Sequence, residues 1–323
     1  MRDTAPPPAP PAAAAPGTAA ALPDPAALPG PAALSGRHVG LFMVLPAFAL
    51  FAVFVLYPVV LTVIASFQEF GLASEQRLFV GFRNYAEMLG DPVFWRSLLN
   101  NVFILVGSVV VQVSLGTVIA AVLDRAVHRF GGLFRTLIFA PMVMSMVAVS
   151  LLWSMIYHPV FGMGTRASDA LGLPPSELGI LGDPGVVMWA ILGVACWQYT
   201  GFVMVIVFAG MQAIPEDLYQ AAKLDGANAV QSFLRITLPG VRNVIAVAVL
   251  LTAIGAFKVF DLIYVLTAGG PGNASEVLGT YIYSTGFTLE RMGYASAIAV
   301  VLLLVAIGLG LVQLRTSRGG ADA

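Results

Sequence analysis

Residues 186–211 read "VVMWAILGVACWQYTGFVMVIVFAGM", and no Asp, Glu, Lys or Arg interrupts this apolar run. A helix needs about 20 apolar residues to cross the hydrocarbon core of a bilayer, so the run is long enough. A membrane-spanning strand would instead show about 10 residues that alternate between apolar and polar. The run is continuously apolar and contains the Gly and Ala residues that membrane helices tolerate. It therefore predicts a transmembrane helix.

Five further apolar runs of comparable length accompany it along the chain. The 323 residues are 59% hydrophobic and only 10% charged, whereas about a quarter of the residues in soluble domains are charged. We therefore predict an all-α membrane protein with six transmembrane helices. The six runs lie at 39–67, 98–123, 135–157, 186–211, 241–267 and 292–314.

The chain ends differ from these runs in composition. Residues 1–36 are almost entirely Pro, Ala and Gly, so few large apolar side chains can offset the entropy lost on ordering. We predict a disordered N-terminal tail. It lacks the charged, apolar and small-residue order of a cleavable signal peptide, so the first run is expected to remain as a helix. One transmembrane domain over 37–315 and a short cytoplasmic tail over 316–323 complete the predicted organisation.

Composition also limits the chemistry. A single cysteine, Cys196, allows neither an internal disulfide nor a cysteine metal site. The three histidines, His38, His128 and His158, lie at separate loop or helix ends, so no metal site is expected. The net charge is −1 and no block of Lys and Arg is present, which disfavours a nucleic-acid partner.

The orientation follows from the Lys and Arg residues between the runs, because cytoplasmic loops carry an excess of them. The two tails and the loops 124–135 and 212–242 together carry ten Lys and Arg residues. The alternate loops 68–97, 158–185 and 268–291 carry five. This bias predicts that both termini are cytoplasmic.

The longest internal cytoplasmic loop, at about 212–240, is patterned. Pro215 suits the first position of a helix, and Glu216 and Asp217 favour the positively polarised N-terminal end. Gly226 is placed to end this helix in a left-handed conformation. The pattern predicts a short helix that ends at a glycine.

A second short helix is predicted directly after the first. Asn228 can cap its beginning and Pro239 can close it. Small residues at Ala221, Ala222 and Ala227 would let another surface approach closely, which favours a docking surface over a plain connector on the membrane. The apolar residues at helical spacing are Val230, Phe233, Leu234 and Leu238.

Residues 219–240, "YQAAKLDGANAVQSFLRITLPG", resemble the EAA loop of ABC importer permeases. Gln220 stands where that family usually has Glu, so the family's ion pair with a basic residue of the ATPase is replaced by an uncharged hydrogen-bond acceptor. Ala221, Ala222, Gly226, Ile236, Leu238 and Pro239 fall on the family pattern. The resemblance implies that the loop docks into a groove on a separate ATPase subunit, through Gln220, Ala221, Ala222, Asp225, Gly226, Leu238 and Pro239.

Other blocks of the chain resemble sugar-importer permeases of the maltose and glycerol-3-phosphate type. They are "FMVLPAFALFAVFVLYPVVLTVIASFQEF" (42–70), "FVGFRNYAEMLGDPVFWRSLLNNVF" (79–103) and "FKVFDLIYVLTAGGPGNASEVLGTYIYSTGFTLERMGYASA" (257–297). This resemblance implies the type I ABC importer permease fold. The C-terminal "LVQLRTSRGGADA" (311–323) lacks the ending of the second permease type, so the chain is assigned to the first.

The resemblance also implies the partners of the chain. They are a second permease subunit in a heterodimer, two ATPase subunits and an extracytoplasmic solute-binding protein, assembled in the bacterial cytoplasmic membrane. The chain would then form half of the pathway for a small-molecule sugar. A polyol or a glycerol phosphate is the alternative solute.

Import against a gradient needs an energy source. A phosphate-binding P-loop requires a Gly-rich turn followed by Lys and then Ser or Thr, and the only lysines, Lys223 and Lys258, do not fit. We therefore expect a non-catalytic subunit that binds no cofactor itself, with ATP and Mg²⁺ on the separate ATPases. An ion-coupled secondary transporter would normally carry ionisable relays within its helices, and only Lys258 and Asp261, three residues apart in the fifth run, qualify here. A membrane enzyme would show a motif such as H-E-x-x-H or G-x-S-x-G, which is absent.

The transport pathway should contain polar side chains within the apolar runs, because such groups are costly in lipid unless they face a cavity. In the resembled family the corresponding two helices line the sugar site. Two alternatives remain open: the Gln and Thr side chains hydrogen-bond neighbouring helices, and the Lys and Asp pair with each other at i, i+3. The candidates are Gln198, Tyr199, Thr252, Lys258 and Asp261.

Overall fold

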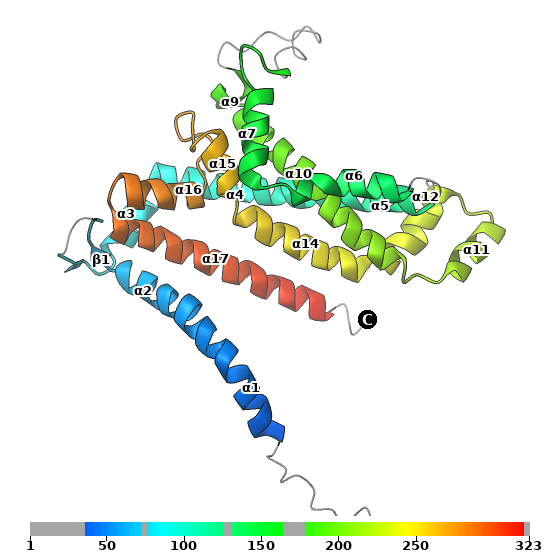
Figure 1. Ribbon diagram of the computed structural model, residues 1–323, viewed down its shortest axis with the longest axis horizontal. Helices are drawn as coiled ribbons and strands as arrows, with labels where there is room; N and C mark the ends of the chain where they lie inside the picture. The colour runs from blue at the N-terminus through cyan, green and yellow to red at the C-terminus, as the bar shows by residue number, and fades with distance from the viewer. Residues whose placement is uncertain (1–35, 73–75, 126–130, 164–178, 320–323) are drawn as a thin grey trace, which may run out of the picture. The chain divides into compact units, whose positions relative to one another are not determined.

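The computed structural model describes residues 36–72, 76–125, 131–163 and 179–319, and helices dominate it (Figure 1). The predicted N-terminal tail, apart from Gly36, lies outside the described residues, as do residues 320–323 of the predicted C-terminal tail. The chain divides into two compact units, residues 1–58 and 59–323, which are described separately.

In the first unit, residues 36–58 form one apolar helical stretch. Helix α1 (Gly36–Phe51) leads into the π-helical turn η2 (Ala52–Leu56), and α2 (Tyr57–Ala65) continues from it. The wide turn precedes Pro58, whose nitrogen has no hydrogen to donate to the preceding turn. The segment Met43–Ala65 is long and apolar enough to cross a membrane.

The second unit opens with a two-stranded antiparallel hairpin, β1 (Gln68–Glu69) and β2 (Leu78–Phe79), followed by α3 (Arg83–Leu89). A long helical rod then combines α4 (Pro92–Ser108), the π turn η3 (Val109–Val113) and α5 (Ser114–Arg125). The next helices are α6 (Gly131–Val143), α7 (Met146–Ile156), α9 (Gly179–Gly182) and α10 (Val187–Met211). The loop region holds α11 (Glu216–Leu224), α12 (Ala229–Ser232), η4 (Phe233–Thr237) and α13 (Leu238–Gly240). The last elements are α14 (Arg242–Phe257), α15 (Asp261–Leu266), α16 (Leu278–Tyr283), η5 (Ser284–Thr288) and α17 (Met292–Gly319).

Three described helices can cross a membrane by length and composition: Met43–Ala65, Pro92–Asp124 and Val187–Met211. The number of candidate spans reaches five if two pairs of consecutive helices, each sharply bent at a short break, are each counted as one span. Helix α17 adds a shorter apolar segment, Met292–Gly308. The described residues therefore contain three to five candidate spans, where the sequence predicted six, and they are helical apart from the short β1–β2 hairpin and the connecting loops.

Two of the six predicted runs are broken rather than continuous. Within 135–157, α6 and α7 are separated at Met144 and Ser145 and bend by 97°. Within 241–267, α14 ends at Phe257 and α15 begins only at Asp261. A run of apolar residues indicates burial in lipid or protein but not whether the backbone stays straight, so hydropathy alone did not reveal these breaks.

At each break, a backbone carbonyl accepts a hydrogen bond from a buried side-chain amide. At the first break, Gln198 Nε2 donates to the carbonyl oxygen of Met144 at 3.2 Å. At the second, Asn101 Nδ2 donates to the carbonyl oxygen of Phe257 at 3.2 Å. Non-helical backbone at membrane depth is tolerated only where protein or water satisfies it, and these two side chains meet that requirement.

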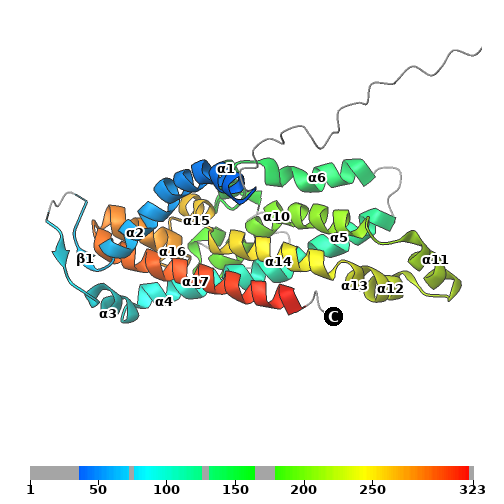
Figure 2. The same cartoon turned by 90° about the horizontal axis from the view of Figure 1, so that it is seen from below.

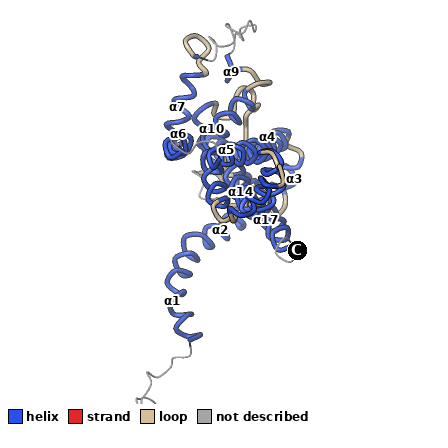
Figure 3. Tube along the Cα trace, turned by 90° about the vertical axis from the view of Figure 1, so that its right-hand side faces the viewer, coloured by secondary structure: helices blue, strands red, loops and turns tan. Residues whose placement is uncertain are grey.

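Helix α10 is the centre of the second unit and packs against α5 and α6 (Figure 2). A Cβ atom at Gly201 would lie 2.2 Å from the carbonyl oxygen of Ile138, so only glycine lets α10 approach α6 this closely. Figure 3 shows α7 leaving the helical bundle steeply, which agrees with its bend from α6. The predicted C-terminal tail begins within α17, which stays helical as far as Gly319.

The second unit has two different ends. Helices α11 and α12 lie at one of them, and α3, α16 and the start of α17 lie at the other (Figures 1 and 2). At the α3 end, the carboxylate of Asp91 caps α4 and accepts hydrogen bonds from the hydroxyls of Tyr281 and Tyr294, the latter at 2.7 Å. Beside it, Arg291 forms an ion pair with Glu87 at 2.7 Å. These contacts join α3 and α4 to α16 and α17.

Candidate functional site: a docking loop and a cavity

The predicted docking loop, at about 212–240, is called the docking loop below, and its first half is helix α11. Pro215 occupies the N-cap rather than the first helical position, and Glu216 and Asp217 lie in the first turn, where the helix dipole favours negative charge. At the other end the backbone nitrogens of Gly226 and Ala227 donate to the carbonyls of Lys223 and Ala222, at 3.2 and 2.9 Å. This is the double hydrogen-bond pattern of a Schellman motif, and Gly226 has the left-handed φ of +75° that it requires.

The second half of the loop runs from α12 to α13. Asn228 Oδ1 accepts from the backbone nitrogen of Gln231, and Gln231 Oε1 accepts from that of Asn228, both at 2.9 Å. This reciprocal capping box fixes the start of the helix that the sequence predicted. Helical structure continues through the π turn η4 to Gly240, one residue beyond Pro239, where the sequence placed its end.

One buried contact holds the two halves of the loop together. The hydroxyl of Tyr219 lies 3.0 Å from Oγ1 of Thr237, and these residues are 8% and 2% exposed. Because Tyr219 belongs to α11 and Thr237 to η4, the two short helices are fixed to each other. The loop is therefore a folded unit and not a flexible connector.

The outer surface of the loop is available to a partner. Most of the residues that the family resemblance assigns to docking are exposed, and Ala222 is half-buried. Large apolar side chains lie among them, and Leu224 is 90% exposed. Clustered exposed apolar residues of this kind mark interaction sites. The exposed docking residues are Gln220, Ala221, Asp225, Gly226, Leu238 and Pro239, and the further apolar ones are Leu218, Val230 and Leu234.

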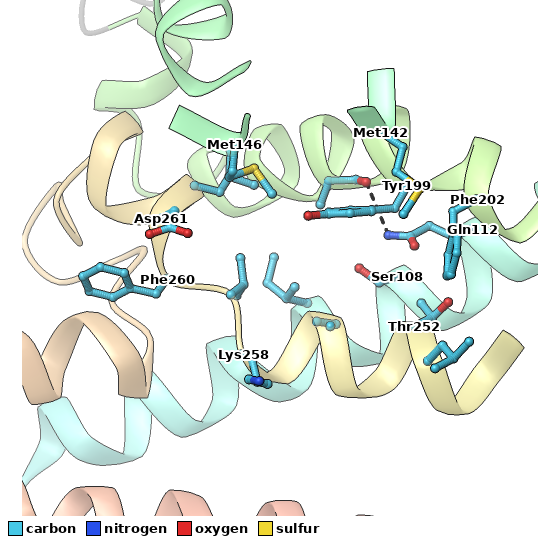
Figure 4. A pocket seen from close by; sticks show the side chains of 17 residues that line it. Ser108, Gln112, Met142, Met146, Tyr199, Phe202, Thr252, Lys258, Phe260 and Asp261 are labelled. Atoms are coloured by element: carbon cyan, nitrogen blue, oxygen red, sulfur yellow. Dashed lines mark hydrogen bonds between the residues drawn. The ribbon is translucent and has the colours of Figure 1, made fainter. Parts of the chain in front are cut away.

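A cavity of about 220 Å³ lies among α4, η3, α6, α7, α10, α14 and α15 (Figure 4). Both helix breaks contribute to its wall: Met142 and Met146 flank the first, and residues 258–261 form the second. The polar lining residues are Ser108, Gln112, Tyr199, Thr252, Lys258 and Asp261.

Four of the five predicted pathway residues line this cavity: Tyr199, Thr252, Lys258 and Asp261. The fifth, Gln198, does not, because it is 1% exposed and bonds to the backbone at the first break. It matches the alternative in which a polar side chain bonds a neighbouring helix.

Lys258 and Asp261 do not pair with each other. The ion pairs found among the described residues are Arg83–Glu69 and Arg291–Glu87. An i, i+3 pair needs a continuous helix, and α14 ends at Phe257, before both residues. Each therefore contributes to the cavity wall by itself.

The sequence analysis missed the contribution of the α4–η3 rod. Ser108 and Gln112 are one helical turn apart, buried, and face the cavity, and Gln112 Nε2 donates to the carbonyl of Ala195 at 3.4 Å. They stand in the apolar run 98–123, so the search for polar side chains that was applied to the later runs would have found them. Phe202 and Phe260 add aromatic faces to the lining.

No group of three or more His, Cys, Asp or Glu within the described ranges could hold a metal ion. The described residues thus combine candidate membrane spans with a polar-lined cavity. The chain belongs to the family of binding-protein-dependent transport system inner membrane components, whose model matches residues 34–318.

Individual relatives cover almost the whole chain. A probable ABC transporter permease protein of Bacillus subtilis, YurN, is 41% identical over 273 residues, which are 84% of this chain and 94% of that protein. The trehalose/maltose transport system permease protein MalF of Thermococcus litoralis is 32% identical over 284 residues, which are 88% of this chain and 95% of that protein. A chain in the crystal structure of a bacterial alginate ABC transporter, in complex with its pentasaccharide-bound periplasmic protein, matches with a TM-score of 0.76 at 24% identity, over 88% of this chain and 95% of that one. The resemblance to ABC importer permeases is thereby confirmed.

Proposed function

We propose that the chain is one of two non-identical permease subunits of an ATP-driven, binding-protein-dependent sugar importer in a bacterial cytoplasmic membrane. The observation that carries this proposal is the combination of a polar-lined cavity at two helix breaks with a rigid, exposed docking loop in one unit. Family membership favours this function over an ion-coupled transporter or a membrane enzyme.

The lining of the cavity suits a sugar. Ser108, Gln112 and Thr252 offer hydroxyl and amide groups for sugar hydroxyls, and Tyr199 and Phe202 offer ring faces for the apolar face of a sugar ring. Relatives named for lactose, trehalose/maltose and arabinooligosaccharides support the same class of solute. A second permease would complete the pathway around this cavity of about 220 Å³.

The contacts give a route from the docking loop to the cavity. Tyr219 ties α11 to η4, and α13 follows η4 directly and meets α14 at a bend of 71°. Helix α14 then reaches the cavity through Thr252. When two ATPase subunits close on bound ATP, a displaced loop would move α14, and the cavity would open to the side on which the binding protein delivers the sugar.

The proposed orientation places the docking loop in the cytoplasm. Leu224, which is 90% exposed, and Val160, which is 82% exposed, lie in loops of opposite predicted sides. In intact cells an impermeant thiol reagent should label a cysteine at Val160 and not one at Leu224. The reverse labelling would overturn the orientation.

Purification of the full complex through a tag on this chain tests the function. The expected companions are a second permease, an ATPase and an extracytoplasmic binding protein. In proteoliposomes, one sugar of a panel of lactose, trehalose and arabinotriose should stimulate ATP hydrolysis and be taken up. Co-purification without an ATPase, or stimulation by no sugar, would contradict the proposal.

A non-sugar solute is a second candidate, and one feature of the cavity favours it. Lys258 is exposed and forms no ion pair within the described part of the chain, so it offers a free cation for a phosphate or sulfonate group. One relative is named for osmoprotective compounds. Stimulation by glycerol phosphate that is lost in Lys258→Gln would favour this candidate.

A further inference from the structure

Four aromatic side chains form a row that starts at the cavity. Phe260, which lines the cavity, stacks on Tyr264 with ring centroids 5.2 Å apart. Tyr264 meets Tyr283 edge-on at 5.0 Å, and Tyr283 is followed by Phe287 at 5.2 Å. We call these four residues the aromatic row. In the part of the chain that the structure describes, no longer row of rings is present.

The aromatic row runs along short elements and not along a membrane-spanning helix. Phe260 and Tyr264 belong to the second helix break and α15, and Tyr283 and Phe287 belong to α16 and η5. Neither α15 nor α16 is long enough to be a candidate span. Figure 4 shows the ring of Phe260 pointing away from the Gln112 end of the cavity. The row therefore continues from the opposite end of the cavity toward α16.

The rings of the row are not used as core. Tyr264 is 41% exposed, Tyr283 37% and Phe287 54%. Rings that served only to fill a core would be buried, because their burial is what stabilises a fold. Three of the four rings are instead partly exposed, and the hydroxyls of Tyr264 and Tyr283 interact with each other at this surface.

A pyranose ring matches this combination of groups. Its axial C–H bonds form an apolar face that packs on an aromatic ring, and its hydroxyls need donors and acceptors at the rim. The exposed carboxylate of Asp261, which follows Phe260 in the sequence, adds a strong acceptor at the cavity end of the row. Because Phe260 lines the cavity, the row is continuous with the space proposed for the sugar.

We propose that the aromatic row is a second carbohydrate-binding surface, on which sugar rings stack as they pass between the cavity and the α16 end of the unit. The inference rests on the proposed sugar-import function. Ring centres 5.0 to 5.2 Å apart let a sugar contact the next ring before it leaves the previous one.

The test compares ring removal with hydroxyl removal in the reconstituted full complex. Tyr264→Leu/Tyr283→Leu removes both rings but keeps apolar side chains, and Tyr264→Phe/Tyr283→Phe keeps both rings. With lactose, trehalose and arabinotriose as probes, the Leu variant should raise the half-saturating concentration for uptake about tenfold, which is about 1.4 kcal/mol. The Phe variant should change it much less. Phe79→Leu, at an exposed ring of β2 outside the row, is the matched control and should leave uptake unchanged.

The outcomes separate this inference from the proposed function. If the wild-type complex takes up one of the probes and the Leu variant takes it up equally well, the aromatic row has no role in sugar binding, although the importer function stands. If the Leu variant loses the second permease during purification, the row is a subunit interface and the inference is wrong. If the wild-type complex takes up none of the probes, the proposed function fails and the inference fails with it.

Discussion

The hydroxyl of Tyr219 lies 3.0 Å from Oγ1 of Thr237, and this buried contact joins the two halves of the docking loop. Tyr219→Phe should lower the melting temperature and weaken the coupling of sugar to ATP hydrolysis, because it strands the buried hydroxyl of Thr237 at a cost of about 1–3 kcal/mol. The double variant Tyr219→Phe/Thr237→Val removes both partners and should recover part of the loss. Equal losses in the single and double variants would show that the contact does not hold the halves together.

Gly226 ends α11 with a φ of +75°, and no atom lies within 4 Å of a Cβ placed there. Backbone strain is therefore the only local penalty of a substitution within the chain, about 1–2 kcal/mol for a residue with a Cβ. Gly226→Val should weaken co-purification of the ATPase and sugar-stimulated hydrolysis while the protein stays in the membrane. Gly226→Asn is the matched control, since Asn adopts the left-handed conformation more easily. Normal coupling of sugar to ATP hydrolysis in Gly226→Val would show that the loop is a plain connector and not a docking surface.

Gln220 is exposed on α11 and holds the position at which the resembled family has Glu. Gln220→Glu should preserve or strengthen the association with the ATPase if the docking groove retains a basic residue, because an ion pair would replace a neutral contact. Its effect should shrink at high salt, which screens exposed charges. Association measured at low and high salt checks this, and weaker association at low salt would show that the groove has no basic partner.

Gln198 and Gln112 are both buried amides, yet the structure gives them different tasks. Gln198→Leu should lower the melting temperature, because the Met144 carbonyl loses its partner at about 1–3 kcal/mol, and should leave the half-saturating sugar concentration nearly unchanged. Gln112→Leu should chiefly raise that concentration, because Gln112 lines the cavity. The melting temperatures and the uptake kinetics of both variants distinguish the two assignments. Opposite results would reverse the two assignments.

Asp91 predicts a pH dependence of stability. Burial opposes ionisation, but hydrogen bonds from Tyr281, Tyr294 and the backbone hold the pKa of Asp91 below its ordinary value. The ionised contact therefore stabilises the fold fully above the unfolded pKa of about 3.9, and is lost as the pH falls through the lower folded pKa. Asp91→Asn can still cap α4, but should melt earlier at pH 7 and lose less stability between pH 5 and 3. Parallel melting curves over that range would contradict this.

The sequence by itself determined the local features of this protein. The lengths of the apolar runs indicated membrane helices, since about 20 apolar residues cross a bilayer whatever their neighbours are. The two short helices of the loop followed from Gly226 and Asn228, because a Schellman motif and a capping box involve only residues within a few positions of each other.

Only the tertiary structure decided where the apolar runs break and which polar side chains reach the cavity. Gln198 and Gln112 look alike in sequence, each an amide in an apolar run, and nothing local indicates that one bonds the carbonyl of Met144, 54 residues away, while the other faces the cavity. The pairing of Lys258 with Asp261 was open for the same reason. It required a continuous helix through both residues, and α14 ends one residue before Lys258. Which hydrogen bonds such side chains form depends on which backbone groups are left without a partner when distant helices pack. Those groups are defined only after the helices have assembled.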